Sequence, residues 1–273
     1  MTPVAGELEA AADRGLLRNR AFLAIWAAQI LSQVASNAIT FALIVLVAEI
    51  TKSNTSSSFL ILFAIVPAVL FGIVAGVIVD RSDRKRMVVV TNLLRAGAVL
   101  PLLLAGESVA TAYIVNFLVA AITTFFVPAE SAMLPSIVRK RDLMVANSLF
   151  TFTFNGAFLF GFILLAPVVI RISGYEALFI LIAAMFAAAA LLCLTLPATP
   201  PPARKIGLEV AGAAMIELKA SLAEAFRYLR RSPQVAWCLV YVALTYTLVA
   251  VAGALAPGFM REVLGTDERN VLI

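Results

Sequence analysis

The sequence predicts an all-α integral membrane protein. Of its 273 residues, 62% are hydrophobic and only 14% are charged, and the mean hydropathy is +1.00. A water-soluble domain is nearer to half apolar and a quarter charged, so this composition is typical of a chain surrounded by lipid. The apolar stretches are also too long, and too free of alternation, to be the strands of a membrane barrel.

Seven apolar segments are long enough to cross a membrane as helices. About 20 mostly apolar residues span the roughly 30 Å hydrocarbon core of a bilayer. The first segment is too long to be a cleaved signal peptide, and both acidic and basic residues precede it. The segments are residues 21–48, 58–79, 87–105, 109–130, 143–170, 177–196 and 235–260.

The basic residues indicate on which side of the membrane each connection lies. Sixteen of the 21 Lys and Arg side chains precede the first segment or lie between segments two and three, four and five, or six and seven. This excess is typical of cytoplasmic loops, so it predicts a multi-pass protein of the cell membrane with a cytoplasmic N-terminus. It also explains the net charge of +5 as a topology signal, so no nucleic-acid partner is expected.

The chain divides into four predicted parts. A cytoplasmic tail (1–20) precedes a six-helix transmembrane domain (21–196), a cytoplasmic linker (197–234), and a seventh helix with the start of an incomplete second half (235–273). Prolines end the sixth helix because proline cannot continue one. Within the linker, apolar residues recur at helical spacing and predict an amphipathic helix on the inner membrane surface. The organisation is that of one half of a larger bundle with the beginning of the other.

The chain contains no histidine and two cysteines. The absence of histidine excludes His-based metal sites, general bases and proton relays. Cys193 and Cys238 lie inside apolar segments, where packing is the expected role. No clustered carboxylates or nucleophile elbow are present, so neither an enzyme, a metal site nor a cofactor is predicted.

The charged connection after the second apolar segment carries a recognisable motif. Its spacing resembles the cytoplasmic loop motif G-x-L-x-D-R-x-G-R-K/R of the major facilitator superfamily. The sequence departs from it at Asp83, where the motif has Gly, and mildly at Ile78, where it has Leu. The matching residues are Gly76, Asp80, Arg81, Arg84 and Lys85.

Four further segments resemble the branch of that superfamily that contains drug-efflux and siderophore-export permeases. They are residues 16–33, 125–150, 225–233 and 261–265, so the resemblance covers nearly the whole chain. It implies twelve helices in two six-helix halves, each half a 3+3 inverted repeat. The expected fold is therefore the N-terminal half plus helix 7. The fifth segment lacks the Gly-Pro pattern of many proton antiporters, which leaves antiport coupling open.

The resemblance also implies a role for the charged loop. In the family this cluster (Gly76, Asp80, Arg81, Arg84 and Lys85 here) is a latch that stabilises the outward-open state, in which the cytoplasmic ends of the two halves meet. The alternative is that the cations only set the topology and that Asp80 is solvated.

Two ionisable residues lie deeper in the membrane. Arg95 and Glu130 are each nine residues from the cytoplasmic cations Arg86 and Arg139, which is about 13 Å along a helix. Charges at such depth usually find partners. Three arrangements remain open: an Arg95–Glu130 ion pair, a relay of Glu130 with Arg84 and Asp80, or an Arg95 that reaches the headgroups. Without histidine, any carboxylate-based proton coupling falls most naturally on Glu130.

A polar stripe on the first helix predicts a substrate cavity. Its five residues share one helical face, and a polar face in hydrocarbon must line a cavity or contact another helix. The alternative role for the polar side chains of the predicted cavity is hydrogen bonding between packed helices. Gly72 and Gly76 are expected to serve close helix packing. The predicted cavity residues are Gln29, Gln33, Ser36, Asn37, Thr40, Asn116, Thr123, Asn147, Thr151, Asn155, Tyr241 and Thr245.

The predicted function is secondary active transport: export of hydrophobic or amphipathic small molecules by alternating access. The alternatives are a lipid or siderophore permease of the same fold, or a truncated membrane fragment that transports nothing. The expected partners are the lipid bilayer, a small-molecule substrate, and either the missing C-terminal half or a second copy of this half. No cofactor is expected, and the proton is the candidate coupling ion.

Overall fold

The computed structural model describes residues 16–104, 108–198, 224 and 226–262, and these contain helices and no strand. Residues 1–15 of the predicted N-terminal tail and most of the predicted amphipathic helix lie outside the described residues, although the last part of that helix, 226–231, is helical. The elements are η1 (Leu16–Arg18), α2 (Arg20–Thr51), α3 (Asn54–Asp80), α4 (Arg84–Val99), α5 (Pro101–Leu104), α6 (Val109–Ile137), η2 (Lys140–Asp142), α7 (Leu143–Phe158), η3 (Leu159–Leu165), α8 (Ala166–Leu194) and α10 (Pro233–Glu262).

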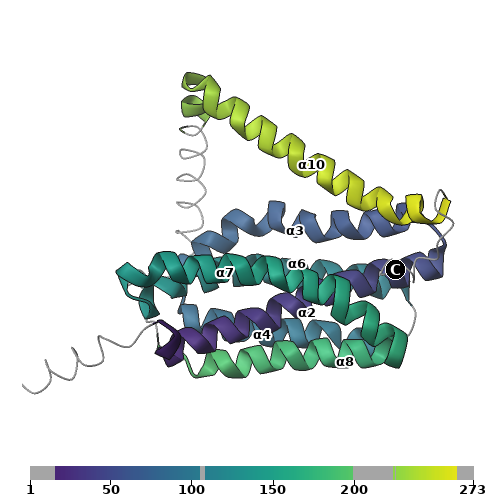
Figure 1. Ribbon diagram of the computed structural model, residues 1–273, viewed down its shortest axis with the longest axis horizontal. Helices are drawn as coiled ribbons and strands as arrows, with labels where there is room; N and C mark the ends of the chain where they lie inside the picture. The colour runs from purple at the N-terminus through teal and green to yellow at the C-terminus, as the bar shows by residue number, and fades with distance from the viewer. Residues whose placement is uncertain (1–15, 105–107, 199–223, 225, 263–273) are drawn as a thin grey trace, which may run out of the picture.

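Five helices of the described part are long and apolar enough to cross a membrane, and the described residues of the predicted segments are helical except Leu100 and residues 195–196. The longest, Lys140–Leu194, contains two predicted segments. It reverses at Gly174, whose φ of 81° and ψ of 179° no other residue adopts without strain. Figure 1 shows the chain turning back there, between α7 and α8. The predicted all-α membrane fold is therefore confirmed, while the internal 3+3 repeat stays a prediction.

Helix α2 is the central element of the bundle. It contacts α3, α6, α7, η3 and α8. Its alanines at 28, 35, 38 and 42 are fully buried, and small side chains let neighbouring helices approach closely. Helix α10 contacts α3 and otherwise diverges from the bundle (Figure 1).

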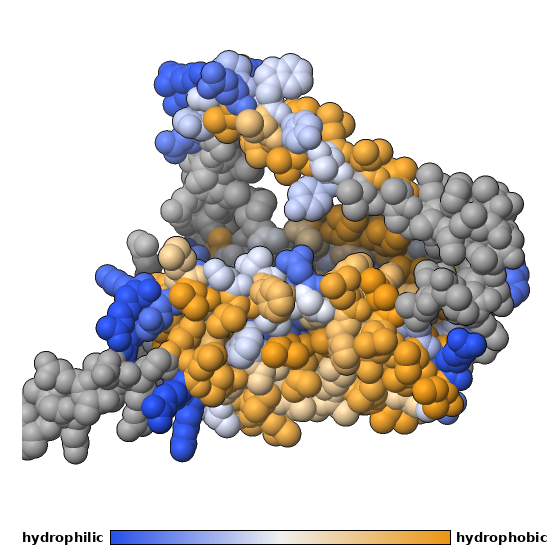
Figure 2. All heavy atoms as spheres, viewed as in Figure 1, coloured by the Kyte–Doolittle hydropathy of each residue, from blue (hydrophilic) through white to orange (hydrophobic). Residues whose placement is uncertain are grey.

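The bundle has two polar ends. At one end, which we call the Asp80 end, Asn19 donates a hydrogen bond to the Ile137 carbonyl. At the other, the Lys52 end, the Tyr113 hydroxyl donates to the Ser56 carbonyl. Figure 2 shows hydrophilic residues gathered at both ends with a hydrophobic band between them. This is the surface expected of a protein that spans a bilayer.

The segment η3 is a short π-helix inside the fifth spanning stretch. Its register is marked by the bond from the Ala166 N–H to the Gly161 carbonyl, five residues back. Pro167 follows directly, and proline has no N–H to continue an α-helical ladder. At this turn the backbone of Gly161 lies against the Val34 carbonyl of α2, so α2 and η3 approach more closely than a side chain would permit.

Asn19→Ala is expected to lower the free energy of unfolding by about 1–3 kcal/mol, because two kinds of bond disappear together. The Asn19 side chain caps α2 by accepting from the N–H groups of Ala21 and Phe22, and it also donates to Ile137. Denaturant unfolding in detergent measures the loss. The control is Asn155→Ala, an exposed residue bonded within its own helix, for which a change within about 0.5 kcal/mol is expected. Equal losses in both variants would contradict this role of Asn19.

Candidate functional site

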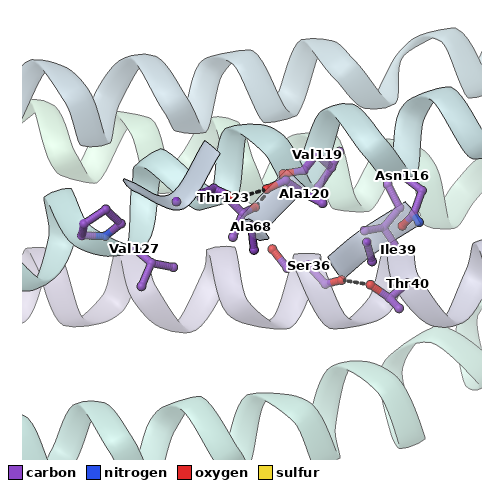
Figure 3. Close-up of a pocket in the computed structure, with 13 residues that line it drawn as sticks. Ser36, Ile39, Thr40, Ala68, Asn116, Val119, Ala120, Thr123 and Val127 are labelled. Atoms are coloured by element: carbon purple, nitrogen blue, oxygen red, sulfur yellow. Dashed lines mark hydrogen bonds between the residues drawn. The ribbon is translucent and has the colours of Figure 1, made fainter. Parts of the chain in front are cut away.

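A cavity of about 560 Å³ lies between α2, α3 and α6. Figure 3 shows Ser36 and Thr40 on one helix facing Asn116, Val119 and Thr123 on another. Most of the lining is apolar, and a few polar groups are spaced along it, which is the usual make-up of a small-molecule site. The lining residues are Ser36, Ile39, Thr40, Ala64, Ala68, Gly72, Asn116, Val119, Ala120, Thr123, Thr124, Val127 and Pro128.

Most polar side chains of the cavity have their donors engaged. The hydroxyls of Thr40, Thr123 and Thr124 each donate to a carbonyl one turn earlier in their own helix, at 2.7–3.0 Å. The Asn116 amide donates to the Leu60 carbonyl of α3 at 2.7 Å. Among the described residues, the buried Ser36 hydroxyl has no hydrogen-bond partner. Ser36 is therefore a cavity-lining donor that no described residue engages.

The chemistry of the cavity follows from this inventory. No lining residue is charged. A bound molecule would find one free O–H donor, acceptor oxygens on the threonines and Asn116, and apolar walls from all three helices. Such a site favours an amphipathic molecule whose bound part is uncharged, because a charge would lose its hydration without gaining a counter-ion.

The structure brings together four of the predicted cavity residues, Ser36, Thr40, Asn116 and Thr123. The rest of the α2 stripe lies outside the cavity: Gln29 donates to the Phe150 carbonyl of α7, Gln33 is buried, and Asn37 donates to the Gln33 carbonyl. Three predicted residues on α7 (Asn147, Thr151 and Asn155) and two on α10 (Tyr241 and Thr245) are exposed, away from this cavity.

Sequence analysis missed the contribution of α3. Ala64, Ala68 and Gly72 recur every four residues, and this row of small side chains leaves room for the cavity. A Cβ on Gly72 or Gly76 would meet no atom of the described residues within 4 Å. Within the described part of the chain neither glycine therefore brings another helix close, and their role in close helix packing stays a prediction. Gly72 lines the cavity between α2, α3 and α6.

The charged loop is organised by Asp83 and Arg84. Asp83, where the motif has Gly, caps α4 by accepting from the Arg86 N–H. Arg84 donates to the Ala132 carbonyl of α6 at 2.8 Å and so ties the loop to that helix. Asp80 is exposed at the end of α3, and within the described part of the chain it has no ion pair or hydrogen bond. Arg81 follows as the C-cap of α3, and Lys85 lies in the first turn of α4.

Arg95 and Glu130 lie in the bundle interior, on α4 and α6. Their side chains belong to residues that are 1% and 4% exposed. Arg95 does not reach the surface, which excludes the headgroup arrangement in this structure. Among the described residues no ion pair within 4.0 Å joins Arg95 to Glu130, and none joins Arg84 to Glu130 or Asp80, so the relay is not present.

A membrane-spanning helical bundle with a binding cavity between its helices is the arrangement of membrane transport proteins. The chain belongs to the Major Facilitator Superfamily, whose profile matches residues 25–273. It is similar to macrolide efflux protein A of Streptococcus pyogenes, with 32% identity over 126 residues, which is 45% of this chain and 31% of the relative. It is also similar to the MFS-type transporter YkuC of Bacillus subtilis (strain 168), with 27% identity over 149 residues, 54% of this chain and 35% of the relative. These matches span about a third of each curated relative.

Proposed function

We propose that this chain forms the N-terminal half of a secondary transporter that exports hydrophobic or amphipathic small molecules by alternating access. The N-terminus and the Asp80 end face the cytoplasm in this proposal, in keeping with the excess of basic residues there. The second wall of the substrate site comes from a C-terminal half or a second copy of this half.

The observation that carries the proposal is the uncharged, largely apolar cavity between α2, α3 and α6. The Ser36 hydroxyl, which no described residue accepts from, suits a ligand that offers an acceptor such as a carbonyl or ether oxygen. The likeness to macrolide efflux protein A supports an efflux direction, since that relative carries efflux in its name. Macrolides, which are large amphipathic lactones, are therefore the first substrates to test.

Transport is tested with the full-length protein in a bacterial host that lacks its own major drug exporters. Cells are loaded with a labelled macrolide or an apolar fluorescent dye, and retention is followed with and without an energy source. Energy-dependent loss of either compound from expressing cells supports export. Uptake of labelled lysolipid or ferric siderophore, with no efflux of macrolide or dye, would replace the proposal with the alternative permease function.

Ser36→Ala is expected to reduce transport efficiency about 2- to 10-fold, because one hydrogen bond to the bound molecule is worth about 0.5–1.5 kcal/mol. The initial efflux rate as a function of internal substrate concentration gives this number. Ser148→Ala is the matched control, since the exposed Ser148 hydroxyl donates to Met144 of its own helix, away from the cavity. An unchanged rate in Ser36→Ala would mean that the cavity donor does not touch the substrate.

A further inference from the structure

The Arg95 guanidinium is held inside the bundle by three groups. Its Nη2 donates to the Asn92 side chain at 2.7 Å. Its central carbon lies 4.0 Å from the ring centre of Phe126 on α6 and 4.7 Å from that of Phe186 on α8. Ring faces stabilise a desolvated cation, but they accept no conventional hydrogen bond. Among the residues that the structure describes, the buried Nε donor has no partner.

Glu130 has an unpartnered acceptor, as Arg95 has an unpartnered donor. Its Oε1 is buried and has no hydrogen-bond partner among the described residues. The ionisable groups that interact with it are Arg95 on α4 and the buried Cys193 thiol on α8. Arg84, on the same helix as Arg95 but at its Asp80 end, donates to the Ala132 carbonyl and forms no ion pair with Glu130. Arg95 is therefore the one positive charge of the described interior available to balance this carboxylate.

An unpartnered donor and an unpartnered acceptor thus occur on two helices that pack against each other, α4 and α6. Leaving either group unpaired in the interior is costly, and internal water molecules typically satisfy such groups. Water can accept from the Arg95 Nε–H and donate to the Glu130 Oε1 at the same time. We propose that Arg95 and Glu130 bind one internal water molecule between them and form a water-linked ion pair that fixes α6 against α4.

This pair acts on the substrate cavity through α6. That helix supplies seven of the thirteen lining residues, from Asn116 to Pro128. Phe126 and Glu130, one turn apart, belong to the Arg95 side of α6, while Val127 and Pro128 line the cavity. Arg95 and Glu130 are therefore positioning residues that touch no substrate. This consequence for the cavity rests on the proposed function, whereas the pair itself does not.

A double-mutant cycle on the full-length protein in detergent tests the pair. Arg95→Met and Glu130→Gln each leave one buried group uncompensated, so each single variant is expected to melt roughly 6 °C or more below wild type. The double variant removes both charges and should recover most of that loss. Arg171→Met and Glu176→Gln, at exposed positions of α8, are the matched controls and should melt as wild type does. Single variants that melt like wild type, or losses that simply add in the double variant, would overturn the pair.

Two further measurements separate the pair from other roles. A structure of the full-length protein that resolves internal waters should show density between Arg95 Nε and Glu130 Oε1, and a dry site or a direct ion pair would overturn the bridging water.

Macrolide affinity, measured on purified protein, should weaken at least threefold in each single variant and return in the double variant. A double variant that melts like wild type but transports without pH dependence would assign Glu130 a coupling proton and overturn the positioning role. The comparison of melting temperatures needs no substrate. If wild-type protein binds no macrolide, that result would therefore count against the proposed function alone.

Discussion

Replacing Gly161 by alanine is expected to destabilise the protein by about 1–3 kcal/mol, the usual range for an overpacked contact. A Cβ at Gly161 would lie 2.5 Å from the Val34 carbonyl oxygen and 3.1 Å from the Asn37 Cβ. The first contact is to backbone, which cannot rotate away as a side chain can. The π-helical turn η3 and helix α2 would have to separate, and α2 also packs against α3, α6, α7 and α8.

Gly156→Ala provides the matched control for this prediction. Gly156 lies one turn earlier in the same spanning stretch, and a Cβ there meets no atom of the described residues within 4 Å. Alanine is the better helix former, so this variant should unfold at the same or a slightly higher denaturant concentration than wild type. Denaturant unfolding of both variants in detergent decides the matter. If Gly161→Ala were as stable as Gly156→Ala, the close approach of η3 to α2 would be refuted.

The class of fold was predictable because it depends on composition and segment length. Runs of about 20 apolar residues have few stable alternatives to a membrane-spanning helix, since backbone groups in lipid must bond within the helix. The π-helical turn at 159–165 was not predictable. It coincides with a tertiary contact, the approach of Gly161 to Val34, and the sequence around Gly161 and Pro167 offered only a poor match to a known glycine pattern.

The cavity was predicted in part, for a physical reason. Polar residues on a spanning helix are conspicuous, so Ser36, Thr40, Asn116 and Thr123 were identified from their type and spacing. Periodicity assigns residues to one face of a helix, but it does not say whether that face meets a cavity or a neighbour. Gln29 shows the difference, because it lies on the same stripe as Ser36 and binds the α7 backbone.

Small residues that leave space for the cavity are harder to identify from the sequence than its polar residues. Ala64, Ala68 and Gly72 line the cavity, where small side chains leave space, but small residues in spanning helices also serve tight helix packing. In the charged loop, too, the sequence pattern did not reveal the structural role of a residue. Asp83 looked like a departure from a motif, yet its carboxylate supplies the N-cap of α4, a role that aspartate fills better than glycine.

Ala120→Phe is expected to lower transport efficiency at least tenfold, which corresponds to about 1.4 kcal/mol of lost substrate interaction. Ala120 lines the cavity from α6, beside Thr123 and opposite the small residues of α3. An aromatic ring at this position would occupy part of the roughly 560 Å³ in which the apolar portion of a substrate is proposed to bind. The initial rate of macrolide or dye efflux from loaded cells measures the effect.

Ile114→Phe on the same helix is the control, because Ile114 is 60% exposed within an apolar spanning helix and does not line the cavity. A ring added there remains in an apolar environment, so transport and membrane insertion should stay at wild-type levels. Comparable amounts of both variants in the membrane fraction would show that the loss in Ala120→Phe reflects the filled cavity rather than misfolding. If Ala120→Phe transports as well as Ile114→Phe, substrate does not pass through this cavity, and the route must be sought along the exposed polar residues of α7, Asn147, Thr151 and Asn155.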